Sequence, residues 1–282
     1  MGRTDALYAL YYTAHRAHTS GRNDVQCIGV ALSSTPGGPF TPSGPAGDED
    51  GHRPLVCPVN QGGAIDADTF TDLDGTHFLL YKTDGNRIAQ PSRLYLQEMA
   101  ADGLTLIGRP RLMLESRPGA PENGVIEAPD LRHHGSHYIL FYSAGPYVGK
   151  DYYTSYAMAD SVTGPYQRAD QPLMTTGSLG GNIIGPGGAM VVPERTGDHI
   201  VFHGYIDNKH TVRGLYTSAL AWDANDNPVI SGSTPRQRRN SRQQITPLGS
   251  PSCTANGLST VEQDPLVLAN LAAMFIAGKC GG

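Results

Sequence analysis

The sequence predicts an all-β protein of the β-propeller type, and three recurring features support this prediction. Short apolar and aromatic runs begin about 60–70 residues apart, and self-similarity at a fixed period is typical of repeat architectures. These runs cover residues 7–12, 74–81, 135–142 and 197–203. A Gly-Pro-aromatic motif follows the first and third runs, at Gly38-Pro39-Phe40 and at Gly164-Pro165-Tyr166. The chain of 282 residues also contains 35 Gly and 21 Pro, as expected for many short strands joined by turns.

The apolar runs are expected to form the inner strands of propeller blades. Each run follows a polar turn and is too apolar for a half-exposed strand, which predicts burial on both faces. Further strand-like segments follow each run, so we interpret each unit as an inner strand plus outer antiparallel strands, about four in all. A β-sandwich, which would not require the Gly-Pro-aromatic motifs at matching places, and a β-helix are the alternatives.

The composition argues against several classes of partner. A net charge of −5 provides no basic field for nucleic acid or for an anionic membrane. Four cysteines are too few for a disulfide scaffold, and their spacing matches no zinc motif. A bridge between Cys27 and Cys57 is compatible with the sequence but cannot be deduced from it. The residues that follow Met1 do not have the pattern of a secretory signal.

Two regions are expected along the chain, a propeller domain over residues 1–230 and a low-complexity tail over residues 231–282. Residues 235–242 are polar and basic, cannot bury a core and are typical of a disordered segment. A nucleic-acid or localisation patch is the alternative interpretation of this run. Residues 266–277 are apolar and follow Asp264-Pro265, which predicts a short helix that cannot span a bilayer.

Glu127 is the first candidate catalytic residue. It lies among the apolar residues Val125, Ile126 and Ala128, with Pro129 behind it. Burial disfavours the ionised form of a carboxyl group and raises its pKa unless the group finds a partner. A raised pKa is what a general acid requires at neutral pH. The alternative is a glutamate at a strand end that points to solvent.

A second carboxylate, Asp66, stands in a matching position about sixty residues earlier. Four aspartates within residues 62–75 suggest calcium, but an EF-hand loop would need an oxygen ligand where Phe70 lies. Asp74-Gly75 fits a hairpin turn. Asp66 follows Ile65 as Glu127 follows its own isoleucine, and equivalent strand starts meet around the axis of a propeller. Two carboxylates that converge on one pocket indicate glycoside hydrolysis.

The sequence resembles glycoside hydrolase family 43, which consists of five-bladed propellers that cleave arabinose- and xylose-containing plant polysaccharides with inversion. The resemblance extends in order over residues 5 to about 230 of the chain. It is carried by Ile65-Asp66, Phe70, Asp74-Gly75, Ile126-Glu127-Ala128-Pro129, Tyr156-Ala157, Gly164-Pro165-Tyr166, Gly185-Pro186-Gly187-Gly188, Phe202-His203, Arg213 and Leu220-Ala221-Trp222-Asp223. Members similar to this chain are fungal arabinofuranosidases or xylosidases.

The resemblance implies a role for each of five residues. Glu127 would be the general acid, and Asp66 would raise the pKa of Glu127 and orient it. Arg213 would meet substrate hydroxyl groups, with an exposed strand arginine as the alternative. His203 would contact substrate or be a satisfied core histidine. Phe70 would line the sugar site or fill core, and we favour core.

The chain departs from the family in two places. Many members carry a histidine after Gly-Pro-Gly that helps to hold a central ion or water, whereas this chain has Gly188, so we expect no cofactor and leave a central calcium open. The catalytic base of the family is an aspartate on the first blade, ahead of the residues present here, and Asp5 lies in the wrong place for it. We therefore expect a chain of about four blades that lacks the first blade and is weak or inactive as written.

Three classes of function remain in view. The first is an inverting glycosidase that acts on arabinose- or xylose-containing glycans, extracellular and monomeric by resemblance to the family. The second is a non-catalytic carbohydrate-binding propeller, which the expected loss of the base would favour. The third is a protein-interaction propeller, for which no convergent buried carboxylates are expected.

Overall fold

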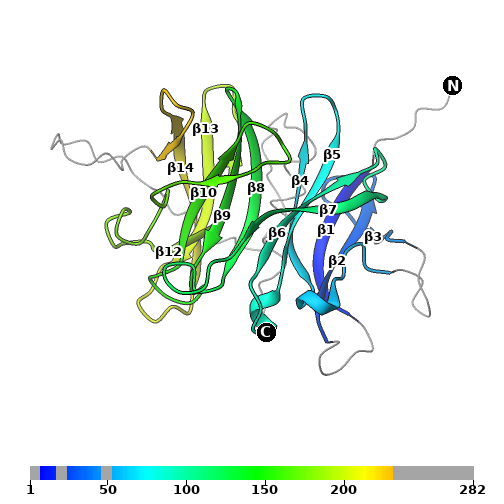
Figure 1. Cartoon of the computed structure of the whole chain (residues 1–282), viewed down its shortest axis with the longest axis horizontal. Helices are drawn as coiled ribbons and strands as arrows, with labels where there is room; N and C mark the ends of the chain where they lie inside the picture. The colour runs from blue at the N-terminus through cyan, green and yellow to red at the C-terminus, as the bar shows by residue number, and fades with distance from the viewer. Residues whose placement is uncertain (1–6, 17–23, 46–52, 231–282) are drawn as a thin grey trace.

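A computed structural model of the chain describes residues 7–16, 24–45 and 53–230. Within these residues fifteen strands form four antiparallel sheets, which confirms the all-β prediction. The sheets follow one another along the chain as the blades of a β-propeller (Figure 1). Residues 231–282, including the expected helix, and Asp5 lie outside the described residues.

Each sheet is formed by consecutive segments of the chain. The first contains β1 (Tyr8–His15), β2 (Gln26–Ser33) and β3 (Thr41–Pro42). The second contains β4 (Ala64–Thr71), β5 (His77–Thr83), β6 (Arg93–Met99) and β7 (Leu106–Glu115). The third contains β8 (Ile126–His134), β9 (His137–Ala144), β10 (Tyr153–Ala159) and β11 (Gln167–Arg168). The fourth contains β12 (Ile184–Val192), β13 (Asp198–Tyr205), β14 (Arg213–Trp222) and β15 (Pro228–Ile230).

Three strands form the centre of the arrangement, and we call them the hub: β4, β8 and β12. Each is the first strand of its sheet, and β8 packs against both β4 and β12. Figure 1 shows β4 and β8 side by side between the outer strands of their blades. Side chains on the hub strands therefore approach one another although they lie about sixty residues apart in sequence.

The core lies between successive sheets. One apolar cluster joins the first and second sheets, one joins the second and third, and one joins the third and fourth. The second strands contribute side chains to clusters on both faces: Leu79 of β5 is buried on one side and Leu80 on the other, and Phe141 and Leu140 of β9 do the same. Burial on both faces accounts for the continuous apolar runs in the sequence.

The prediction that these runs are the inner strands is wrong by one strand. The runs at 74–81, 135–142 and 197–203 contain β5, β9 and β13, which are the second strands of their sheets. The hub strands precede them and read as irregular sequence, because β4 carries two aspartates and β8 carries Pro129. Pro129 lies in the edge strand β8 between the paired residues Glu127 and Asp130, where the register shifts and a proline interrupts no pair of the ladder.

All three hub strands contain a bulge at the same place. The pairing shifts by one residue between Ile65 and Asp68 in β4 and between Glu127 and Asp130 in β8. It shifts in the same way after Gly187 in β12. Asp66, Ala128 and Gly188, the residues that follow the last pair before each shift, have positive φ angles of 55°, 52° and 58°. An extra residue redirects the following side chains to the opposite face, so the bulge decides which groups point into the hub.

A buried ionic network joins the hub strands beyond the bulges. Asp130 is 2% exposed, and its Oδ1 lies 2.8 Å from Nη2 of Arg132. The other oxygen of Asp130 accepts a 2.8 Å hydrogen bond from the backbone N–H of Val191 in β12. Asp68 of β4 occupies the register position equivalent to Asp130 and is also buried. This network therefore ties all three strands together.

Two further features of the described chain bear on its setting. Cys27 and Cys57 form a disulfide bond with Cα atoms 4.8 Å apart, which resolves the pairing that the spacing left open. No helix in the described ranges is long and apolar enough to cross a membrane.

The substitution Asp68→Asn should stabilise the protein at neutral pH. Burial and the neighbouring charge of Asp130 hold the pKa of Asp68 well above its ordinary value. The unfolded chain releases this proton at lower pH than the folded chain, so the free energy of unfolding falls as pH rises between the two pKa values. Asparagine removes the titration, and we expect a gain of roughly 1 kcal/mol at pH 7, or about 2–4 °C in Tm, that disappears near pH 4.

Denaturant unfolding at both pH values measures this effect. The matched control is Asp130→Asn, which breaks the contact with Arg132 and should cost about 2 kcal/mol or more at pH 7. A loss of stability in Asp68→Asn that grows from pH 4 to pH 7 would contradict the proposed protonation of Asp68.

Candidate active site

Glu127 lies at the hub and is held at both carboxylate oxygens. Its Oε2 accepts a 2.7 Å hydrogen bond from Nζ of Lys82, and its Oε1 accepts a 2.7 Å hydrogen bond from the hydroxyl of Tyr152. The Glu127 side chain keeps 14% of its surface exposed, so it remains in reach of solvent. Two contacts from different blades therefore determine how this carboxylate points.

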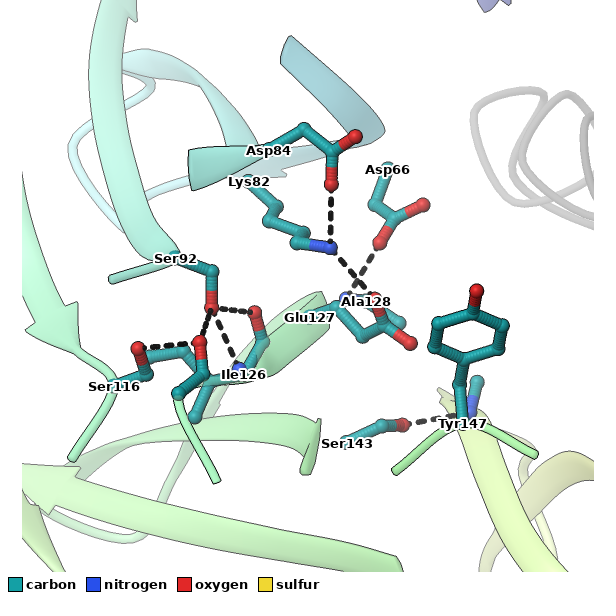
Figure 2. A network of polar contacts seen from close by, with 12 residues as sticks. Asp66, Lys82, Asp84, Ser92, Ser116, Ile126, Glu127, Ala128, Ser143 and Tyr147 are labelled. Carbon is teal, nitrogen blue, oxygen red and sulfur yellow. Dashed lines mark hydrogen bonds and ion pairs between the residues drawn. The ribbon is translucent and has the colours of Figure 1, made fainter. Parts of the chain in front are cut away.

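Lys82 is the cation of the site, and its side chain is 2% exposed. It comes from β5, opposite Ile65 of the hub strand β4. Besides Glu127, its Nζ contacts Oδ1 of Asp84 at 3.1 Å. Figure 2 shows Lys82 between the two carboxylates, with Asp66 beside them. The ammonium group is thus enclosed by acidic groups.

Asp66 is linked to Glu127 by a hydrogen bond to the backbone of the next residue, Ala128. Its Oδ2 accepts a 3.0 Å hydrogen bond from the N–H of Ala128, the residue that follows Glu127. Asp66 lies on the hub strand β4 and Glu127 on the hub strand β8, but the expected equivalence of the two residues is shifted by one residue. Glu127 is equivalent to Ile65, whereas Asp66 is equivalent to Ala128, because the bulge begins at these residues. Asp66 therefore reaches the site from within the bulge.

The two carboxyl groups are perturbed in opposite directions. Burial raises the pKa of Glu127, but Lys82 and the hydroxyl of Tyr152 outweigh this effect and lower it. For Asp66, burial and the charge of Glu127 raise the pKa to about 6. The expectation of a raised pKa for Glu127 is therefore wrong for this structure, because the sequence did not identify the cation beside it.

Tyr152 contacts Glu127, and its ring packs directly against Gly187. A Cβ atom on Gly187 would lie 2.0 Å from the Tyr152 ring, so only glycine leaves the ring its place. On its other side, Tyr152 stacks on His203 with ring centroids 6.1 Å apart and an interplanar angle of 7°. Gly188 donates a 2.7 Å hydrogen bond to Oγ of Ser143 and so fixes β12 against β9. The Gly-Pro-Gly-Gly motif thus shapes the wall of the site.

His203 and Arg213 lie on the fourth blade. Burial, then the charge of Arg213, lowers the pKa of His203 to about 4, so its ring is neutral near pH 7. Its Nδ1 atom is buried and makes no hydrogen bond with any described residue. Arg213 is exposed and donates to the backbone oxygen of Tyr147 at 2.7 Å, while its guanidinium lies 5.0 Å from the centre of the Tyr205 ring. The contacts of the arginine are therefore with Tyr147 and Tyr205, whereas Lys82 and Tyr152 contact Glu127.

Phe70 does not join this group. It pairs with Phe78 near the far end of β4 and packs edge-on against Tyr138 in the core between the second and third blades. The structure supports the core interpretation of Phe70 and not the substrate contact. The reason is the strand itself, which carries Phe70 four residues beyond Asp66 and away from the hub carboxylates.

The sequence analysis missed Lys82, Asp84 and Tyr152. Lys82 had a usable signal, because it is the single charged residue in the apolar run of residues 78–83. A lysine in a strand buried on both faces needs a counter-charge. Tyr152 had no such signal, since its role depends on a contact between two segments of the third blade that lie 25 residues apart. Within the described ranges, no group of three or more His, Cys, Asp or Glu side chains is arranged to hold a metal ion.

A β-propeller with two neighbouring carboxyl groups at its hub fits the class of propeller-fold glycoside hydrolases. The sequence model of Glycosyl hydrolases family 43 matches residues 2–228, and the chain belongs to this family. The fold agrees with this assignment. A solved structure of a thermostable family-43 glycoside hydrolase superposes with a TM-score of 0.64 at 25% identity, covering 82% of this chain and 74% of that one.

Two relatives of known activity match parts of the chain. It is 32% identical over 178 residues to Beta-D-galactofuranosidase xynD of Aspergillus niger, covering 62% of this chain and 46% of that protein. It is 26% identical over 239 residues to Arabinan endo-1,5-alpha-L-arabinosidase B of Emericella nidulans, covering 68% of this chain and 59% of that protein. The chain thus spans about half the length of these relatives.

The substitution Gly187→Ala should displace Tyr152 from Glu127. The added methyl group overlaps the ring, and overpacking of this kind costs about 1–3 kcal/mol. We expect a lower midpoint of denaturant unfolding and the loss of the Tyr152–Glu127 hydrogen bond in a crystal structure of the variant. The matched control is Gly177→Ala, where a Cβ would meet no atom closer than 3.8 Å. Equal stability of both variants would show that Tyr152 is not confined by Gly187.

Proposed function

We propose that the chain is a glycosidase in which Glu127 is the proton donor to the leaving glycosidic oxygen. The observation that supports this most directly is the fixed position of Glu127, which Lys82 and Tyr152 hold at both oxygens while its side chain stays 14% exposed. A general acid must present its proton in a defined direction, and two donors from separate blades provide that direction. Inversion of configuration is the stereochemical outcome we propose, from the family resemblance.

Asp66 is proposed to act on Glu127 and not on the substrate. An ionised Asp66 would favour the protonated form of Glu127 by the same repulsion that raises the pKa of Asp66, and its hydrogen bond to Ala128 holds the backbone that carries Glu127. In the opposite direction, the charge of Glu127 contributes to the raised pKa of Asp66. The pair therefore retains a proton at higher pH than two isolated carboxyl groups would.

His203 and Arg213 are proposed to bind sugar hydroxyl groups. A neutral imidazole whose Nδ1 has no partner among the described residues can exchange a hydrogen bond with a hydroxyl group. The exposed guanidinium of Arg213 offers several donors. We propose an arabinose- or xylose-containing glycan as substrate. The relatives named above act on arabinan and on galactofuranosides, so a galactofuranoside belongs in the same test.

The setting of the protein is part of the proposal. The disulfide between Cys27 and Cys57 favours an oxidising compartment, since such bonds are rare in the cytosol. We propose an extracellular, monomeric enzyme without a resident cofactor, and leave a central calcium open.

Hydrolysis of nitrophenyl α-L-arabinofuranoside, β-D-xylopyranoside and β-D-galactofuranoside tests the proposed function. Glu127→Gln should lower kcat/KM on the preferred glycoside by about 10²–10⁴, the usual contribution of general acid–base catalysis. The loss should be larger on a disaccharide of the same sugar than on its dinitrophenyl glycoside. Dinitrophenolate is a good leaving group and departs without being protonated, whereas the sugar alkoxide of a disaccharide needs the proton.

Glu98→Gln is the matched control, because Glu98 is an exposed glutamate on β6 and its replacement should leave kcat/KM unchanged. Unchanged activity in Glu127→Gln would exclude its role as the proton donor. Sugar binding without turnover, lost in Asp66→Ala, would instead identify a carbohydrate-binding propeller. A protein partner whose binding survives both substitutions would indicate an interaction propeller.

A further inference from the structure

Lys82 is the buried lysine of the described chain. The other two lysines in the described residues, Lys150 and Lys209, are exposed, whereas the Lys82 side chain is 2% exposed. Burial of an ammonium group costs several kcal/mol unless charged partners compensate it. Glu127 and then Asp66 and Asp84 do so, and they raise the pKa of Lys82 to about 12 against the effect of burial. Lys82 therefore carries its charge at neutral pH and well above it.

The ammonium group of Lys82 links two carboxylates, Asp84 on one side and Glu127 on the other. Asp84 directly follows β5, two residues beyond Lys82, and holds Nζ at 3.1 Å. The same Nζ atom lies 2.7 Å from Glu127 of the next blade. Asp84 thus fixes the lysine from within its own blade, and the lysine fixes the glutamate across the blade boundary. Figure 2 shows this order of side chains.

Groups from four elements face Glu127. Asp66 comes from β4, Lys82 from β5, Tyr152 from the residue before β10 and His203 from β13. Among the described residues, Lys82 is the cation in direct contact with Glu127, because His203 is neutral near pH 7 and the contacts of Arg213 are with Tyr147 and Tyr205. The charge of Lys82 therefore opposes the effect of burial at this carboxylate.

We propose that Lys82, braced by Asp84, is a positioning residue that orients Glu127 and restricts its protonated form to acidic pH. This inference rests on the proposed function, in which Glu127 donates a proton. An ammonium group 2.7 Å away favours the carboxylate form, so the acid form is available only at lower pH than it would be without the lysine. Lys82 therefore determines the alkaline limit of activity.

Lys82→Met tests this inference, because methionine has a similar length and no charge. The Glu127 titration is followed by carbon NMR of ¹³C-labelled carboxyl groups, assigned with Glu127→Gln, and needs no substrate. We expect the Glu127 midpoint to rise by about 1–3 pH units, the usual effect of an opposite charge at this distance. The alkaline limb of the kcat/KM profile should move upward by the same amount.

Asp84→Asn provides a second test with the opposite sign. It leaves Lys82 less neutralised, so the Glu127 midpoint and the alkaline limb should move downward. This variant keeps the lysine in place, so it can test the inference even if Lys82→Met does not fold. Circular dichroism would show whether Lys82→Met folds. Lys150→Met is the matched control and should leave both midpoints unchanged.

The outcomes separate this inference from the proposed function. A Glu127 midpoint that stays within 0.3 pH units in both Lys82→Met and Asp84→Asn overturns the inference, even if the native chain hydrolyses glycosides; we set this limit well below the ~1–3 unit effect expected. Shifts of opposite sign support it, even if the native chain turns over no substrate. A uniform loss of kcat across pH with no shift of either limb would assign Lys82 a structural role alone and would also overturn the inference.

Discussion

The bulges in the three hub strands are the constraint on which the rest of the structure depends. Side chains alternate along a strand, so one extra residue exchanges the faces of everything that follows. In β8 this places Glu127 in the site and Asp130 in the ionic network with Arg132. In β4 the bulge residue Asp66 reaches the same site, while Asp68 joins Asp130. One short strand can therefore supply both a group for chemistry and a group that holds the blades together.

Charge compensation follows from this geometry. The bulges bring the carboxyl groups of Asp66 and Glu127 together at a place where burial penalises both charges. Lys82 and Tyr152 stabilise one of them as the anion, and the other keeps its proton to higher pH. The result is a pair of carboxyl groups with pKa values displaced in opposite directions, and the contacts of Glu127 with Lys82 and Tyr152 decide which of the two is lowered. The lysine and the glutamate come from different blades, so the pairing also depends on how the blades pack.

The propeller could be predicted from sequence because its second strands are buried on both faces. That burial leaves continuous apolar runs such as residues 135–142, and the runs repeat. The hub strands escaped recognition because they face one another across polar groups and contain residues such as Asp66 and Pro129 that normally end a strand. The same polar residues made the carboxylates recognisable, since a charged residue among apolar neighbours is conspicuous in a sequence. Phe70 was also correctly favoured as core.

The sequence by itself determined the all-β architecture, the repeat and the two candidate carboxyl groups. Each of these produces a local pattern of polar and apolar residues that can be recognised without the fold. Only the tertiary structure decided which group each carboxylate meets. The contacts of Glu127 with Lys82 and Tyr152 and of Asp66 with Ala128 join residues 25 to 62 positions apart. No local pattern specifies such contacts, because they arise when blades pack and a bulge sets the register. The direction of each pKa shift depends on these contacts, and so it too was decided by the folded structure.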